Sequence, residues 1–313
     1  MAKKYLDPKA DLTFKKVFGE HPDLVTSLLN ALLPFKKGEE IESVEYLSPE
    51  LVPENPLRKF SIVDVRCRDN RGRQFLVEMQ MVWSREFKQR VMFNSAKAYV
   101  RQLDSKEEYH LIEPVYSLNI VNDIFEKDIS DYYHYYRMVH EKHTDKVIDG
   151  LHLVFVELPK FTPQTISEKK MQVWWLRYLT EIEERTKEVP QELLDNPEIS
   201  KALTVVEESA YTEAQMAAYD KFWDIIRTER TYYNSAHRDG FKEGHDAGLE
   251  AGYKKGEEKG IKEGIEKGIQ EGIKEGLEKE KHETINRLKS KGFDIATIAI
   301  ATDLSEEEVM RYI

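Results

Sequence analysis

Two short segments joined by a turn constrain most strongly how this 313-residue chain can fold. Apolar and polar side chains alternate through residues 63–68, and a second run of strand-forming residues covers 75–82. Period-2 alternation is typical of a strand with two unlike faces. The Asp-Asn-Arg-Gly sequence at 69–72 is typical of a turn. The sequence therefore predicts a β-hairpin.

The hairpin carries two acids and an amide, which adjacent strands would bring to one edge of a sheet: Asp64, Glu78 and Gln80. Two carboxylates on neighbouring strands offer the oxygen ligands that Mg²⁺ prefers. Glu78 also lies in an almost wholly apolar run, where a carboxylate is costly unless it is paired or bound to a metal. This pattern favours a metal-dependent nuclease. The alternative is a hairpin whose polar face is simply solvated.

The rest of the first half alternates between helical and strand patterns. Apolar spacing predicts helices over residues 11–18, 24–33 and 84–103, and strands near 41–47, 60–67, 115–121 and 151–158. This order predicts an α/β core with helices packed against a mixed sheet. We expect four parts: a nuclease-like domain at 1–165, a helical extension at 166–238, a glycine-repeat helix at 239–280 and a small helical module at 281–313.

Composition limits the cellular setting and the partners. The single cysteine, Cys67, excludes an internal disulfide and a cysteine-built zinc site. No apolar leader and no stretch of membrane-spanning length is present, so we expect a cytoplasmic protein without a membrane partner. The net charge is −11, yet residues 1–110 carry 19 Lys and Arg against 17 Asp and Glu. The more basic part therefore holds the candidate site.

A repeat of period four occupies residues 240–276, where ten of the fifteen glycines are spaced by four without a break. Each glycine inside a helix costs about 0.5–1 kcal/mol relative to alanine. Close approach of a partner helix could offset this cost, and a repeat longer than 3.6 residues favours right-handed winding of the partners. We therefore expect a homo-oligomer formed through the C-terminal helices. The alternative, a solvated spacer, stays open.

The last residues, 292–313, have the pattern of two short helices, the second with a capping box at Ser305 and Glu308. Their outline is similar to a helix-turn-helix, but several acids there would repel phosphates. A protein-contact module is the favoured interpretation.

Several separate motifs in the first half, in the expected order, give the chain a resemblance to the PD-(D/E)XK nuclease family transposases, also called recombination-promoting nucleases. The motifs are Asp-Leu-Thr-Phe-Lys-Lys-Val-Phe-Gly at 11–19, Val-Asp-Val at 63–65, Val-Glu-Met-Gln at 77–80, Phe-Lys-Gln-Arg at 87–90 and Val-Glu-Leu-Pro-Lys-Phe at 156–161. The similarity covers roughly residues 5–180.

The resemblance implies a restriction-endonuclease-like core and Mg²⁺-dependent cleavage of DNA, with Mn²⁺ as an alternative ion. Asp64 and Glu78 would be metal ligands, with the carbonyl oxygen of Met79 as a third. Asp11 matches an acidic position that helps to orient metal-bound water. Lys15 and Gln89, in the matching motifs, would contact DNA phosphates.

Gln80 departs from the wider superfamily, which has a lysine at this position. Lysine offers a positive charge to the attacking water and the developing oxyanion, whereas glutamine offers only hydrogen bonds. The helix after the hairpin presents one face with four polar residues, Arg90, Asn94, Lys97 and Arg101. We expect Arg90 or Lys97 to supply the missing charge. The alternative for Lys97 is a merely solvated position.

The leading prediction is a Mg²⁺-dependent DNA endonuclease that acts in recombination or on mobile elements. The contrasting prediction is a catalytically weakened nuclease fold that binds DNA or associates with itself. Gln80 keeps this second prediction open.

Overall fold

The predicted hairpin forms in the computed structural model, which describes residues 4–51, 59–103, 107–163, 171–184 and 186–313. Strand β4 (Val65–Asp69) pairs antiparallel with β5 (Gln74–Gln80). In the turn between them, the Asp69 carboxylate accepts hydrogen bonds from two backbone N–H groups, and Gly72 adopts φ +89°. This left-handed conformation favours glycine, so the turn residues fix where the hairpin reverses.

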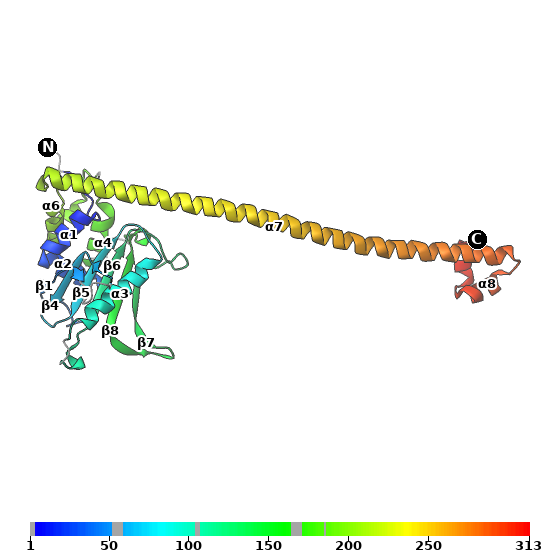
Figure 1. Ribbon diagram of the computed structural model, residues 1–313, viewed down its shortest axis with the longest axis horizontal. Helices are drawn as coiled ribbons and strands as arrows, with labels where there is room; N and C mark the ends of the chain where they lie inside the picture. Colours follow the sequence, from blue (N-terminus) through cyan, green and yellow to red (C-terminus); the bar gives the residue numbers. More distant parts are fainter. Residues whose placement is uncertain (1–3, 52–58, 104–106, 164–170, 185) are drawn as a thin grey trace. The chain divides into compact units, whose positions relative to one another are not determined.

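The hairpin belongs to a mixed six-stranded sheet with the order β1-β4-β5-β6-β8-β7 (Figure 1). The four further strands are β1 (Val44–Tyr46), β6 (Val115–Val121), β7 (Tyr133–His140) and β8 (His143–Glu157). Strands β5, β6 and β8 run parallel, and the other pairs are antiparallel. A separate two-stranded sheet joins β2 (Glu50–Leu51) to β3 (Ser61–Ile62). The mixed α/β sheet flanked by helices confirms the predicted class.

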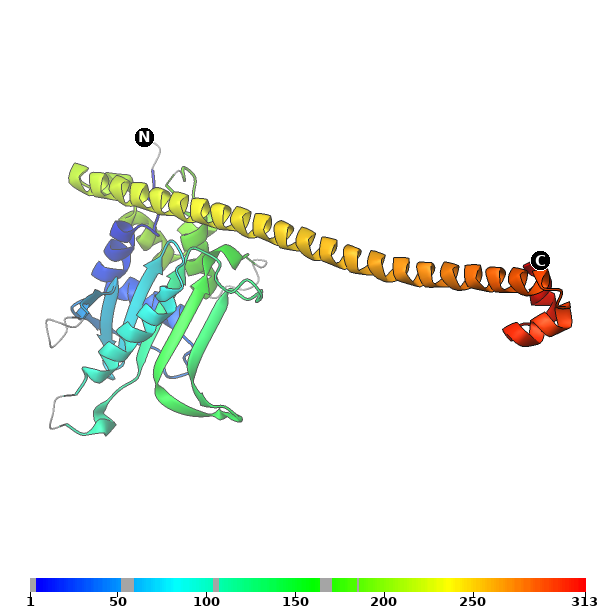
Figure 2. The ribbon, with the colours of Figure 1, turned by 45° about the vertical axis from the view of Figure 1, so that its right-hand side comes forward.

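Helices cover both faces of this sheet (Figure 2). On one face the main core is built by α1 (Asp11–Glu20), α2 (Pro22–Leu32), α4 (Met171–Glu181) and α6 (Pro197–Val205). Helix α3 (Glu86–Val100) packs on the other face through Phe87, Val91 and Ala98. The short helical segments are η1 (Tyr109–Leu111), η2 (Leu158–Lys160), α5 (Gln191–Leu194) and η3 (Glu208–Ala210).

Two details of the hairpin differ from the sequence-based expectation. The strand expected at 60–67 is interrupted by a bend at Asp64, with β3 ending at Ile62 and β4 beginning at Val65. Strand β5 has buried side chains on both faces from Gln74 to Glu78, because it is an inner strand between β4 and β6 and α3 covers its second face. The acids therefore lie at the ends of inner strands and not along a lateral edge of the sheet.

The chain divides into one unit at residues 1–233 and another at 234–313. The expected boundary at 165/166 lies outside the described residues. Helix α7 (Glu213–Ser290) begins in the first unit, where its first turns pack on the core. No helix among the described residues has the length and apolar character needed to cross a membrane.

The second unit contains the rest of α7, α8 (Ile295–Thr302) and α9 (Glu306–Arg311). A small core joins Ile285 of α7 to residues of α8 and α9. The predicted capping box at Ser305 and Glu308 is present at the start of α9. Two short helices at the C-terminus are thus confirmed.

Candidate active site

Asp64 lies at the bend just before β4, beside the last residues of β5. Because Val65 pairs with Val77, the continued register places Asp64 next to Glu78. The Asp64 Oδ2 atom accepts a hydrogen bond of 2.8 Å from the backbone N–H of Met79. A carboxylate therefore takes the place of the next ladder bond at this point. The N–H and C=O of a strand residue point to the same side, so the Met79 carbonyl also faces Asp64.

Glu78 is the more deeply buried acid, with 5% of its surface exposed. Its side chain lies between the sheet and α3. The Asn94 side chain donates a hydrogen bond of 3.0 Å to Oε1, and the Arg90 guanidinium lies 3.4 Å from Oε2. Both partners come from α3, because residues 90 and 94 are one helical turn apart.

Burial and mutual repulsion make this pair of carboxylates electrostatically costly. Burial raises the pKa of Asp64, although the Met79 N–H and the nearby Lys15 partly oppose this shift. Burial also raises the pKa of Glu78; Arg90 opposes this shift, whereas the charge of Asp64 adds to it. A cation bound between the two acids would relieve both costs. Carboxyl groups in such surroundings are typical of functional sites.

Lys15 connects the first helix to this pair. Its Nζ atom lies 2.5 Å from the Asp11 carboxylate and 3.7 Å from Asp64 Oδ1. Asp11 begins α1, and the spacing of four residues places Lys15 one turn further along the same face. Asp11 therefore joins the cluster through Lys15.

Gln80, at the end of β5, is held at both ends of its amide. Its Nε2 atom donates to the Val82 carbonyl at 2.5 Å, and its Oε1 atom accepts from Arg90 at 2.6 Å. Arg90 thus contacts both Gln80 and Glu78, while 47% of its side chain remains exposed. Where the superfamily pattern has a lysine, this chain has a glutamine that positions an arginine from the next helix.

Two of the expected DNA-contacting residues lie elsewhere on α3. The Lys97 Nζ atom donates to the backbone carbonyls of Leu51 and Lys59, at 2.5 and 2.9 Å. It therefore ties α3 to the end of β2 and to Lys59, and is not directed at the acids. Gln89 is exposed on the helix surface.

Two contributions to the site were not predicted from the sequence. Asn94 was recognised as part of a helical face, but its hydrogen bond to Glu78 depends on how closely α3 packs on β5. The first turns of α7 also pack Phe222 and Trp223 onto a small cluster that contains Met81, just after the end of β5. No local pattern could indicate a contact between residues more than 140 positions apart.

The donor set fits a hard divalent cation. Two carboxylates and a backbone carbonyl are oxygen ligands, and Mg²⁺ commonly uses one or two carboxylates and keeps several waters. Among the described residues, no three His, Cys, Asp or Glu side chains are grouped closely enough to hold a metal. The protein's share of the coordination would therefore rest on Asp64, Glu78 and the Met79 carbonyl, as in sites completed by water and substrate.

Comparison with known proteins identifies the family of the chain. No curated protein and no solved structure matches the chain significantly. A family model described as PD-(D/E)XK nuclease family transposase matches residues 8–233. The match extends beyond the similarity expected at roughly residues 5–180 and includes α6 and the first turns of α7. Because it covers more than half of the chain, the protein belongs to the PD-(D/E)XK nuclease family transposases.

Proposed function

We propose that this protein is a metal-dependent DNA endonuclease that hydrolyses phosphodiester bonds, using Mg²⁺ or Mn²⁺, in recombination or mobile-element biology. Family membership supports a nuclease related to mobile elements. The observation that carries the finer proposal is the pair of Asp64 and Glu78, both with raised pKa values, beside two cationic side chains. The mixed sheet with helices on both faces is compatible with a restriction-endonuclease-like core.

Each side chain has a role in this proposal. Asp64, Glu78 and the Met79 carbonyl would hold the divalent ion, which when bound lowers the pKa of a water and neutralises charge on the phosphate. Asn94 fixes the Glu78 carboxylate by its hydrogen bond. Lys15 and Arg90 approach the acids from α1 and α3, so a phosphate at the site would meet a cation on each side.

Plasmid nicking tests the proposal. The expected result is conversion of supercoiled to open-circular DNA with Mg²⁺ or Mn²⁺, and no conversion with EDTA. Protein that binds DNA but cleaves it in neither metal would contradict the proposal. That outcome would favour the alternative, a catalytically weakened fold that binds DNA or itself.

Lys15→Ala and Arg90→Ala are each expected to slow nicking by about 10²-fold, since each removes a cation facing the reacting phosphate. Lys97→Ala is the matched control, because Lys97 is bonded to backbone carbonyls away from the acids. Single-turnover rates, measured with folding checked by circular dichroism, give the comparison. Wild-type rates in both the Lys15 and the Arg90 variants would exclude this assignment of the charge.

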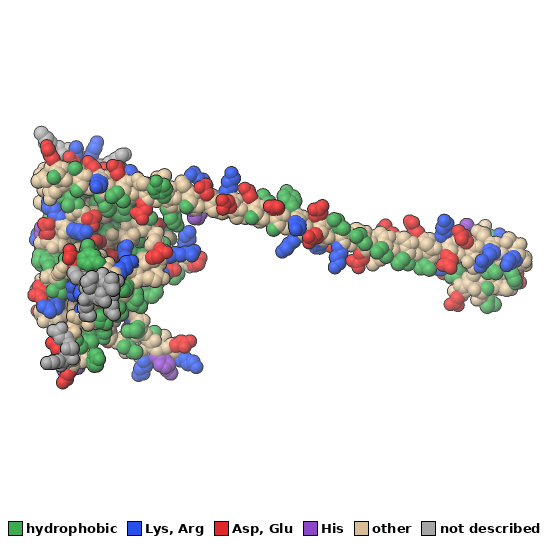
Figure 3. Space-filling view, viewed as in Figure 1, with side chains coloured by type: hydrophobic (Ala, Val, Ile, Leu, Met, Phe, Trp, Pro, Cys, Tyr) green, Lys and Arg blue, Asp and Glu red, His purple; other side chains and the backbone are tan. Residues whose placement is uncertain are grey.

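We further propose that residues 240–280 of α7 associate with a second copy of the chain. Adding a Cβ to any glycine from Gly240 to Gly276 would meet nothing within 4 Å, so the described chain makes no use of their small size. The apolar residues that follow them are exposed along this part of α7 (Figure 3), among them Ile261, Ile265, Ile269 and Ile273. Close helix packing would use both features.

The geometry limits how this contact is made. Each four-residue step advances about 40° around the helix, so the glycine stripe completes about one turn over roughly 54 Å. Two nearly straight helices could therefore share only a few repeats, and a longer contact requires right-handed winding. Sedimentation velocity of a variant lacking residues 240–280 is expected to show a smaller oligomer than the full chain. An unchanged oligomeric state would contradict self-association through this segment.

A further inference from the structure

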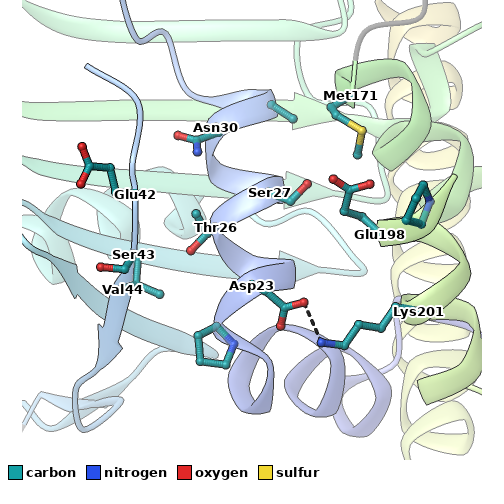
Figure 4. Close-up of a pocket in the computed structure, with 13 residues that line it drawn as sticks. Asp23, Thr26, Ser27, Asn30, Glu42, Ser43, Val44, Met171, Glu198 and Lys201 are labelled. Carbon is teal, nitrogen blue, oxygen red and sulfur yellow. Dashed lines mark hydrogen bonds and ion pairs between the residues drawn. The ribbon is translucent and has the colours of Figure 1, made fainter. Parts of the chain in front are cut away.

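A groove runs along the exposed side of α2, with β1 on one flank of this helix and the start of α6 on the other (Figure 4). Its volume is about 910 Å³. Strand β1 and the residues before it form one wall, with Glu42, Ser43 and Val44. Helix α2 contributes small polar side chains, including Thr26 and Ser27. Small side chains leave room for the side chains of a ligand.

The backbone of β1 is open on the side away from β4. Among the described strands, β1 pairs only with β4. The N–H of Leu47 donates to the Arg66 carbonyl of β4 at 2.9 Å. Because strand residues direct their backbone groups alternately to the two sides, Val44 and Tyr46 direct theirs away from β4. Such a row can pair with another extended chain.

This open edge has a definite start. The Asn30 side chain of α2 accepts from the Ile41 N–H at 2.8 Å and donates to the Ile41 carbonyl at 2.9 Å. It makes the two bonds that a neighbouring strand would make. The edge is thus closed at Ile41 and open from Val44, where the groove lies.

The groove carries negative charge. Its lining includes the acids Asp23, Glu42 and Glu198 and one cation, Lys201. Lys201 is paired with Asp23 at 2.6 Å, and this hydrogen bond holds the pKa of Asp23 below its ordinary value. The remaining acids have no cation of the lining to balance them. DNA would be repelled here, whereas cationic side chains would be attracted.

We propose that this groove binds an extended segment of a partner protein that is rich in lysine or arginine, which pairs with β1 as an added strand. Alternate side chains of the segment would face the groove, so cations at every second position suit it. α2 packs on the sheet face opposite to α3 and Glu78. The groove is therefore separate from the candidate active site and does not depend on the proposed nuclease activity.

Fluorescence anisotropy with the full chain tests the proposal. The probe is a labelled peptide of four Lys-Val repeats, and the comparison peptides are four Glu-Val repeats and a Lys-Val peptide N-methylated at alternate amides. We expect only the unmodified Lys-Val peptide to bind, and we expect added salt to weaken its binding. Equal binding of the Glu-Val or the N-methylated peptide would overturn the proposal.

Two variants locate the contact by independent routes. Val44→Pro removes an outward-facing N–H while the bonds of β1 to β4 through Leu47 remain, and Thr26→Arg fills the groove from α2 with the opposite charge. Each is expected to weaken peptide binding at least about tenfold, about 1.4 kcal/mol. Asp145→Asn, exposed on β8, is the matched control. Wild-type affinity in both groove variants would overturn the proposal, as would a wild-type dimer that Val44→Pro dissociates, since the occupant would then be a second copy.

Discussion

Asp64→Asn is expected to reduce metal-dependent nicking by about 10³-fold, because a lost ligand removes several kcal/mol of charge stabilisation. The same change should leave the metal-free protein equally stable or more stable. Asparagine can still accept the hydrogen bond from the Met79 N–H, and it removes a partly buried charge that repels Glu78. This combination of results would show that the wild-type carboxylate serves the proposed activity at a cost in stability.

Thermal unfolding with and without Mg²⁺ separates these two effects. A ligand that binds only the folded state raises the melting temperature. Wild-type protein should show this rise, and Asp64→Asn should lose it. Asp145→Asn, a change of the same chemistry at an exposed site, should behave as wild type in both assays. An Asp64→Asn protein that nicks DNA at the wild-type rate, or still gains stability from Mg²⁺, would show that Asp64 is no ligand.

Among these substitutions, Glu157→Ala is expected to cause the largest loss of folding stability. Glu157 ends β8 and is fully buried. Its carboxylate accepts hydrogen bonds from His134 at 2.9 Å and from the N–H groups of Phe125 and Glu126, and it pairs with Lys160. Removing one partner of such a buried network costs about 3–5 kcal/mol. For a domain of this size the melting temperature should fall by about 6–20 °C.

The pH dependence of this stability loss tests whether the charge of Glu157 is its cause. Burial alone would raise the pKa of Glu157, but hydrogen bonds from Lys160, His134 and the two N–H groups outweigh burial and lower it. A carboxyl whose pKa is lower in the folded state stabilises the fold above its unfolded pKa of about 4.3. This stabilisation is lost as the pH falls through the lowered value.

Urea unfolding of wild type and Glu157→Ala should therefore differ most near neutral pH and converge in acid. Glu141→Ala, at the exposed turn between β7 and β8, is the matched control and should follow wild type throughout. A constant difference between wild type and Glu157→Ala at every pH would indicate lost packing and not lost charge.

Local patterns predicted the elements that depend on near neighbours. The turn at 69–72 was predictable because its residues favour a left-handed position, and the hairpin followed from it. The capping box at Ser305 was also predictable, because it depends on two residues only three positions apart. The burial of both faces of β5 was not, because it depends on β6 and α3, which contact β5 only after the chain has folded.

The candidate site shows the same division. The acids were predicted from strand spacing and the family resemblance, and the structure brings Asp64, Glu78, Gln80 and Arg90 together with Lys15 and Asp11. Helical spacing alone could not separate Arg90 from Lys97, since both lie on one face of α3. In the structure Arg90 donates to Gln80, whereas Lys97 donates to the backbone carbonyls of Leu51 and Lys59. Their different partners arise from tertiary packing.

The hydrogen bond between Asp64 and the Met79 N–H has a stereochemical consequence. The backbone engages Oδ2, so Oδ1, the oxygen near Lys15, is the one that would bind an ion in the proposed site. In the proposed site, a carboxylate fixed in this way would hold a cation through one oxygen. Water and phosphate oxygens would then supply more of the other ligands. A single backbone N–H would thus limit how many protein oxygens reach the ion and how much water the ion keeps.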